Sequence, residues 1–331
     1  MATMKTLNGY GFNATELNGK AASDYLQKTD TASDSAKLGG KAPEYYLQPR
    51  NLLDNSDFRN PVNQRAITSA DVSAWTYFID RWKVEDNTLT ISVETDGIHL
   101  TASSGAWFAQ WIQMSDNDVG KTFTLAYGLS DGSIIMASGT MPDTSEWSEF
   151  ITGANDAAQI RSACFENRKI TVGINPKSNL VIKWAALYEG SYTADTLPPY
   201  MPKGYAAELA ECQRYFERLG STFSEQVGNV VYVASGAKSF ICSLQCSRKR
   251  IAHPSVSISG VNNYRLLLKD ATNASVYGAA SISSFNDVTV QEPFISFRVN
   301  IAETTINQNS WIQLQRADGA TAAYIDVSAD I

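Results

Sequence analysis

The sequence has few of the residues that enzymes use for acid–base and metal chemistry. Only two histidines, His99 and His253, occur among 331 residues. A catalytic triad base, a zinc cage or a proton relay would have to use one of them. His99 lies in an alternating, strand-like stretch and His253 precedes Pro254 in a turn, so we interpret both as structural or surface residues.

Cysteine is also scarce, and no motif for a bound group is present. The four cysteines form no metal-type CxxC pair, and we interpret all of them as reduced core residues: Cys164, Cys212, Cys242 and Cys246. Phosphate-loop, dinucleotide and zinc signatures are absent. Residues 115–118 offer closely spaced oxygen ligands but lack the rest of a calcium-binding pattern, so we interpret them as a turn. We expect no cofactor and no metal.

Charge and hydropathy limit the possible partners. The chain has 27 Lys and Arg against 34 Asp and Glu, a net charge of −7, and only 18% of its residues are charged. The acidic balance disfavours an extended footprint on nucleic acid. No run of 18 apolar residues could span a membrane, and the first residues lack the pattern of a secretory signal. We therefore expect a chain with sizeable cores, no nucleic-acid partner and no membrane insertion.

Residues 51–192 have the pattern of an all-β domain. Short alternating or apolar runs are separated by turn signals such as Asp96-Gly97 and Asn175-Pro176, which favours a β-sandwich or jelly roll. The predicted strands are Leu89 to Val93, Ile98 to Ala102, Trp107 to Gln113, Thr122 to Tyr127, Ile134 to Ser138, Gln159 to Phe165, Lys169 to Ile174 and Asn179 to Leu187.

Residues 223–331 are predicted to form a second all-β domain. Eight runs suit another sandwich or jelly roll, so the predicted fold class is all-β with two such domains. The runs are Val230 to Ala234, Ser239 to Cys246, Ser255 to Ser259, Tyr264 to Lys269, Val276 to Ser281, Phe294 to Ile301, Trp311 to Gln315 and Ala323 to Val327.

Residues 193–222 are predicted to be a proline-rich linker and one short helix. Three prolines between Pro198 and Pro202 keep the backbone extended. The apolar positions that follow, from Tyr205 to Leu219, are spaced like a two-heptad seam. Two heptads are weak alone, so packing on a neighbouring domain and self-association are competing interpretations of this helix.

A short repeat lies within residues 1–50. The segment Leu17 to Ala21, LNGKA, recurs as LGGKA from Leu38 to Ala42, and each copy reads as a glycine turn followed by one or two helical turns. Units this short cannot bury a core alone. We interpret them as attachment and spacer repeats that are ordered by winding around identical copies of the chain. A flexible linker and a duplicated spacer are the alternatives.

The strongest functional signal is the aromatic content of the middle region. Flat rings can stack on sugar faces while amides and carboxylates hydrogen-bond the hydroxyls. In a strand, Trp107 and Trp111 would share one face and Phe108, Gln110 and Ile112 the other, and one of these faces must be core. The candidate carbohydrate-binding residues are Trp75, Tyr77, Trp107, Trp111 and Trp147.

Several short segments occur in a recognisable order. They are NLLDNSDF at 51–58, NPVNQR at 60–65, IDRW at 79–82, QWI at 110–112, GKTFTL at 120–125 and LYEGS at 187–191. Together they resemble a β-sandwich of tail-fibre and receptor-binding proteins of bacteriophages and prophages, a domain similar to carbohydrate-binding modules. The linker and helix up to Tyr215, the ending from Tyr324 to Ile331 and the upstream repeat also resemble parts of such fibres.

The resemblance implies a homotrimer in the virion tail that binds a host cell-surface glycan without catalysis. Its N-terminus would attach to other tail or baseplate proteins, and the protein would be made in the bacterial cytoplasm without a signal peptide and act outside the cell. Residues 223–331 would be the receptor-binding tip. There we expect contacts from two loops and a neighbouring tryptophan: Asn262, Asn263, Tyr264, Asn307, Asn309 and Trp311.

Two functions of other classes remain open at this point. A glycan-degrading tailspike, a depolymerase or glycosidase, needs only two carboxylates across a cleft, and the acidic candidates are Asp80, Glu94, Asp143, Glu146 and Glu149. A purely structural baseplate spacer would bind no host cell at all.

Overall fold

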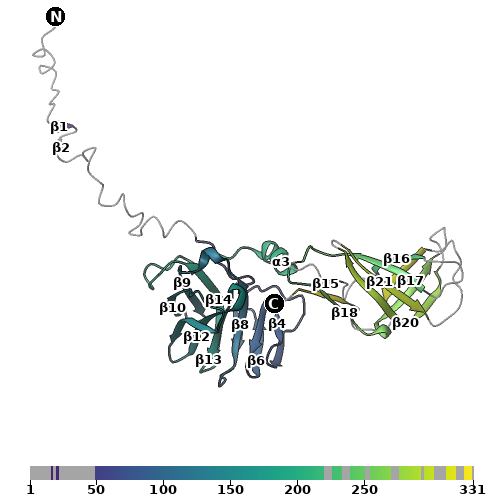
Figure 1. Cartoon of the computed structure of the whole chain (residues 1–331), viewed down its shortest axis with the longest axis horizontal. Helices are drawn as coiled ribbons and strands as arrows, with labels where there is room; N and C mark the ends of the chain where they lie inside the picture. Colours follow the sequence, from purple (N-terminus) through teal and green to yellow (C-terminus); the bar gives the residue numbers. More distant parts are fainter. Residues whose placement is uncertain are drawn as a thin grey trace, which may run out of the picture. The chain divides into compact units, whose positions relative to one another are not determined.

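The structure is a computed structural model in which antiparallel strands dominate (Figure 1). It describes residues 16–17, 20–21, 49–219, 226–232, 239–249, 254–269, 276–291, 294–301, 311–317 and 324–329. The chain divides into two compact units, residues 1–50 with 192–199 and residues 51–191 with 200–331. The prediction that the chain is mostly β is confirmed. Among the described residues, no helix is long and apolar enough to cross a membrane.

In the smaller unit, the first copy of the repeat contains a strand pair. β1 (Glu16–Leu17) pairs antiparallel with β2 (Lys20–Ala21), with Leu17 opposite Lys20. The second copy, and the helical turns expected in both, lie outside the described residues.

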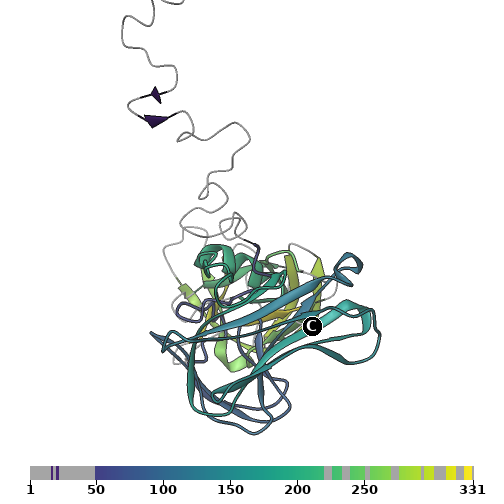
Figure 2. The same cartoon turned by 90° about the vertical axis from the view of Figure 1, so that its left-hand side faces the viewer.

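Residues 51–191 contain two six-stranded antiparallel sheets. The strands are β3 (Ser69–Val72), β4 (Tyr77–Ile79), β5 (Trp82–Glu85), β6 (Leu89–Glu94), β7 (Gly97–Leu100), β8 (Trp107–Gln113), β9 (Thr122–Leu129), β10 (Ile134–Thr140), β11 (Ser148–Ala154), β12 (Ala158–Phe165), β13 (Lys169–Pro176) and β14 (Leu180–Glu189). One sheet has the order β10-β9-β14-β7-β6-β3, and the other has the order β11-β12-β13-β8-β5-β4. Figure 2 shows these strands as blue to teal ribbons, from a second direction.

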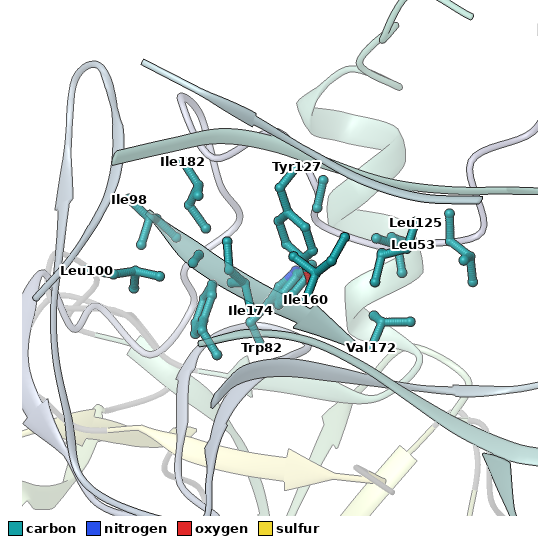
Figure 3. Packing of buried hydrophobic residues seen from close by; sticks show 14 of the residues in the cluster. Leu53, Trp82, Ile98, Leu100, Leu125, Tyr127, Ile160, Val172, Ile174 and Ile182 are labelled. Atoms are coloured by element: carbon teal, nitrogen blue, oxygen red, sulfur yellow. The ribbon is translucent and has the colours of Figure 1, made fainter. Parts of the chain in front are cut away.

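The core of this sandwich lies between the two sheets. Tyr127 from β9 and Trp82 from β5 are both fully buried, and Figure 3 shows them among apolar side chains between the ribbons. Trp82 stacks on Phe108 with ring centroids 5.1 Å apart and meets Phe58 edge-on at 5.0 Å. The sequence had left open which face of β8 is buried. The face with Phe108 is core, and the face with Trp107 points outward.

All eight strands predicted for this region are present, but four further strands were missed. These are β3, β4, β5 and β11. The strand β5 alternates apolar and charged residues, and its charged members, Lys83 and Glu85, are almost as buried as Trp82 and Val84. Charged residues normally mark solvent-exposed positions, so the sequence gives no sign that Lys83 and Glu85 are buried. The alternation of residue types over this short segment therefore did not identify the strand.

Side chains of the segment at 51–58, which carries much of the resemblance, form hydrogen bonds to the backbone of the same domain. The Asn55 side chain donates to the backbone oxygens of Val62 and Asp80 at 2.8 and 2.7 Å and accepts from Val62 N at 2.7 Å. Asn51 Oδ1 accepts from Leu187 N at 3.0 Å. These side chains satisfy buried backbone groups that would otherwise be costly to leave unpaired, which explains the motif by folding alone.

The predicted helix is present but shorter than expected. α3 spans Tyr205–Gln213, and Phe216 begins a strand, β15 (Phe216–Leu219). The expected two-heptad seam is therefore wrong beyond Cys212, because β15 pairs with a strand near the end of the chain, β23 (Ile325–Ser328). Tyr205, the first seam position, is 47% exposed. A pairing with residues more than a hundred positions away cannot be detected from local spacing.

Glu208 anchors α3 to the start of the sandwich. Its Oε2 accepts a hydrogen bond from Asn55 N at 2.6 Å, while Oε1 is buried without a partner among the described residues. Burial raises the pKa of the Glu208 carboxyl, partly offset by the bond from Asn55. The ionised form therefore opposes folding.

We expect Glu208→Gln to stabilise the protein at neutral pH by about 1 kcal/mol, with the advantage shrinking on acidification. Because the pKa of Glu208 is raised in the folded protein, the folded wild type is most stable when Glu208 is protonated. It loses that stability as the pH rises from the ordinary pKa of glutamate through the raised pKa of the folded protein. Denaturant unfolding at several pH values measures the difference. Glu146→Gln, at an exposed glutamate, is the control. An advantage that grows on acidification would contradict the assignment.

The C-terminal region is a closed barrel rather than the second sandwich or jelly roll predicted. Its strands are β16 (Gln226–Tyr232), β17 (Ser239–Gln245), β19 (Tyr264–Lys269), β20 (Val276–Gln291), β21 (Phe294–Ile301) and β22 (Trp311–Arg316). They follow the ring order β16-β17-β21-β20-β19-β22, and β16 also pairs with β22. A separate sheet has the order β15-β23-β18, where β18 spans Ser255–Ile258. Barrels and sandwiches share the same period-2 alternation, so sequence pattern does not separate them.

Candidate functional site

The sheet that contains β8 carries an outer surface of rings and charges, which we call the aromatic face. Its residues come from five strands, β4, β5, β8, β12 and β13, from the turn before β4 and from the segment before β11, and they are linked by the contacts described below. They are Trp75, Tyr77, Lys83, Glu85, Trp107, Trp111, Trp147, Arg161, Phe165 and Thr171. All five aromatic candidates from the sequence are therefore brought to one surface.

Glu85 is the centre of the aromatic face. Its carboxylate accepts hydrogen bonds from Thr171 Oγ1 at 3.1 Å, from Arg161 Nη2 at 3.2 Å and from Trp111 Nε1. The Glu85 side chain is only 2% exposed. One residue thus binds three neighbouring strands together and fixes the indole of Trp111.

Two small residues lie between Glu85 and two of the groups that it contacts. In the strand register Glu85 lies opposite Trp107 on β8. It contacts Trp111 on β8 and Thr171 on β13, which lie opposite each other. The pair Ala109 and Gly173 lies between these two residues and Trp107. A Cβ atom on Gly173 would lie 3.3 Å from Ala109 Cβ and 3.4 Å from the Trp107 ring. A side chain at position 173 would therefore crowd Ala109 and the Trp107 ring.

Two cations cover two of the rings. The Arg161 guanidinium lies 4.0 Å from the ring centroid of Trp107, and the ammonium of Lys83 lies 3.5 Å from that of Trp111. Such cation–π contacts contribute about 0.5–2 kcal/mol each, more where they are desolvated. Lys83 is 6% exposed. Trp107 and Trp111 are therefore half-buried rings, each with a face already in contact with a positive charge.

The other two tryptophans are the exposed ends of a row of rings. Trp75 meets Trp111 edge-on at 6.2 Å, Trp111 meets Phe165 at 4.9 Å, and Phe165 stacks on Trp147 at 5.9 Å. Trp75 is 58% exposed and Trp147 is 51% exposed. The row presents two indoles to solvent and supports each of them with a more buried ring.

The backbone of Trp75 is unusual for a bulky residue. It has a φ of 64° in a turn where Thr76 N donates to Ser73 O at 3.2 Å. Positive φ at this turn position is normally given to glycine or asparagine, and for other residues it costs of order 1–3 kcal/mol. The turn is held to β5, because Trp75 N donates to Val84 O at 2.7 Å. A strained and exposed tryptophan is a feature that folding alone does not explain.

The sequence did not identify Lys83, Glu85, Arg161 or Phe165 as part of this surface. The alternation of Trp82, Lys83, Val84 and Glu85 could have revealed a strand with a charged outer face. Conversely, Trp82, one of the aromatic residues of this region, belongs to the core.

The residues expected to contact the receptor at the C-terminal tip are only partly accessible or lie outside the described residues. Tyr264 is 2% exposed, and its hydroxyl donates to Tyr324 O at 2.6 Å. It is a barrel core residue and not a surface contact, which corrects the expectation. Asn262 is exposed and Asn263 is half-buried in the short 3-10 turn Val261–Asn263. Residues Asn307 and Asn309, and the side chain of Trp311 at the start of β22, lie outside the described residues.

The carboxylates considered for catalysis are dispersed within the described part of the chain. Asp80 accepts from Arg65 at 2.7 Å, Asp143 pairs with Arg168 at 2.7 Å, and Glu149 lies 3.8 Å from Arg161. Glu94 lies 3.7 Å from His99. These four therefore have different partners, as expected for structural and surface acids.

The run 115–118 is a turn, as predicted. It contains the 3-10 turn Asp116–Asp118, in which Asp118 accepts from Ser115 N at 2.9 Å. Asp116 pairs with Arg168 at 3.0 Å. The carboxylate oxygens of the run are thus used by the protein itself.

A depression of about 320 Å³ lies on the other sheet of the sandwich. It offers hydroxyl groups and an imidazole but no Trp, Tyr or Phe ring, and His99 Nε2 already lies 2.7 Å from Asp96. Its lining consists of Ser69, Thr90, Ile91, Ser92, His99, Leu100, Thr101, Asn179, Leu180 and Val181. Glu94, Asp96 and His99 lie within 4.8 Å of one another, but no further observation points to an ion there. The aromatic face is the better candidate for a binding site.

No protein-family model matches the chain, and no curated protein sequence matches it either.

Proposed function

We propose that this chain is a receptor-binding tail-fibre protein of a bacteriophage or prophage and that its aromatic face binds a glycan of the host cell surface. One observation carries the proposal. Trp75 and Trp147 are both more than half exposed on a face whose other rings and charges hold them in place.

The energetics support a binding role for these rings. Burying a large apolar side chain contributes roughly 1.5–3 kcal/mol to the free energy of folding or binding. The two exposed indoles are only partly buried in the free protein, so a ligand that covers them would gain part of this free energy. Large exposed aromatic side chains that gather on one face are typical of surfaces that meet a ligand. Sugars fit such a surface because each pyranose ring has an apolar C–H face and a rim of hydroxyl groups.

The proposed assembly is a homotrimer in the virion tail, attached to other tail or baseplate proteins through the N-terminal segment. Three equivalent sites on one fibre would convert weak single contacts into an avidity gain of roughly 100-fold or more on a dense glycan layer. Binding, and not hydrolysis, is the proposed activity. The catalytic candidates Asp80, Glu94, Asp143 and Glu149 have different partners, which supports this choice, whereas a tailspike depolymerase needs two carboxylates that face each other.

The test is to measure adsorption of the intact protein to a panel of bacterial strains and to a glycan array, together with its mass by light scattering. We expect adsorption, no new reducing ends on the bound polysaccharide, and a trimer of about 109 kDa, three times 36.2 kDa. Sustained release of reducing ends would establish the depolymerase. Binding to no strain and no glycan would establish the structural spacer, and a monomer at all concentrations would contradict the fibre.

A further inference from the structure

We infer that the ligand of the aromatic face is an uncharged oligosaccharide that contacts Trp75 and Trp147, with Trp107 and Trp111 serving as supports. This inference rests on the proposed glycan-binding function and specifies its ligand class and its contact residues.

The available rings are the two at the ends of the row. A ring that stacks on a sugar must offer a free face, yet Trp107 and Trp111 each have a cation within 4.0 Å of the ring centroid. Trp75 and Trp147 have their nearest cations at 5.5 and 5.3 Å and are more than half exposed. They are separated by two intervening rings, Trp111 and Phe165. A chain of linked sugars can reach both, whereas a monosaccharide reaches only one.

The charges of the face disfavour an acidic glycan. The Arg161 guanidinium is 13% exposed and is shared among Glu85, Asp86 and Glu149. Lys83 lies beneath the rings. The better exposed charges are two carboxylates, Asp86 at 46% and Glu149 at 42%, against one half-buried ammonium, Lys169. A carboxylated or sulfated sugar would find no free guanidinium here and would approach a negative rim.

The strain at Trp75 identifies it as a contact residue. Glycine adopts its φ of 64° without penalty, so a purely structural turn would be better served by glycine. Trp75→Gly removes the indole and relieves the backbone at the same time. We expect this variant to unfold at the same or a higher denaturant concentration than the wild type and to lose binding. A structural residue would behave in the opposite way.

The experiment compares the wild type, Trp75→Gly and Trp147→Ala on a glycan array that carries both neutral and acidic oligosaccharides, and in adsorption to bacterial cells. We expect neutral glycans among the ligands, with binding reduced at least about 10-fold by each substitution. Binding should also change less than about 2-fold between about 0.05 and 0.5 M NaCl, because no ion pair forms. Phe294→Ala, at a 49% exposed ring of the barrel, is the matched control and should bind normally.

The outcomes separate this inference from the function beneath it. Ligands that are mainly carboxylated or sulfated would overturn the inference, as would binding that both tryptophan substitutions leave unchanged. Loss of binding in Phe294→Ala alone would move the site to the barrel. In each of these cases the protein still binds glycans or cells, so its proposed role in receptor binding stands, although binding unaffected by the tryptophan substitutions or lost only in Phe294→Ala would remove the aromatic face as the site. Absence of all binding by the wild type would instead remove the proposed function and the inference with it.

Discussion

Replacing Glu85 by alanine is expected to lower the free energy of unfolding of the sandwich by about 3–5 kcal/mol, the usual cost of removing one partner of a buried charge pair. The substitution leaves the Arg161 guanidinium, 13% exposed, without its most buried carboxylate. It also removes the acceptor of Trp111 Nε1 and Thr171 Oγ1. Urea unfolding measures the loss, and the fluorescence of the folded variant should report a less restricted indole.

The matched control for this prediction is Glu149→Ala. Glu149 approaches the same Arg161 at 3.8 Å but is 42% exposed, and exposed pairs contribute at most about 1 kcal/mol. If the two variants lose equal stability, Glu85 is an ordinary surface acid and the aromatic face lacks the centre assigned to it. A binding defect in Glu85→Ala together with full stability would instead indicate that Glu85 contacts the ligand.

Trp82→Ala is expected to destabilise the sandwich by about 3–5 kcal/mol, enough to unfold a marginal domain. Trp82 is fully buried, stacks on Phe108, and donates through Nε1 to the backbone oxygens of Asp54 and Asn55 at 3.1 and 2.9 Å. The substitution creates a large cavity and leaves two carbonyl groups without this donor. Circular dichroism and urea unfolding of the purified variant measure the effect.

Trp147→Ala is the control for the core tryptophan. It removes the same side chain from a position that is 51% exposed, so the stability loss should stay within about 1 kcal/mol. Similar losses in Trp82→Ala and Trp147→Ala would mean that burial does not distinguish these two rings. The two variants therefore test whether Trp82 belongs to the core and Trp147 to the exposed aromatic face, as the inference on ligand contacts requires.

The strands that could be predicted are those with apolar residues at every second position, which form one apolar face. Strand β8 was predicted to the residue, and its outward pair, Trp107 and Trp111, was recognised as sharing a face. Strand β5 was missed because its outward residues, Lys83 and Glu85, are charged yet buried. Their burial depends on partners from β8, β12 and β13, and none of these is near them in sequence.

The candidate site could be predicted only as a list of aromatic residues. Residue type indicated Trp75 and Trp147, but it equally indicated Trp107 and Trp111, whose rings are covered by cations. At the tip, Tyr264 appeared as a loop residue beside two asparagines and is instead part of the barrel core. Solvent exposure is a property of the packed molecule, and residue type alone does not determine it.

The amino-acid sequence is enough to predict the all-β character of this protein, and it shows the concentration of tryptophan in residues 51–192. Alternation with a period of two is a local property of the chain and needs no knowledge of what lies opposite. The tertiary structure alone decided the closure of the barrel, the end of α3 at Gln213 and the position of Glu85 among three strands. Each of these depends on pairing between distant segments, which is set by strand register and packing. The exposure of Trp75 and Trp147 also depends on the fold, because residue type did not separate these two rings from Trp107 and Trp111.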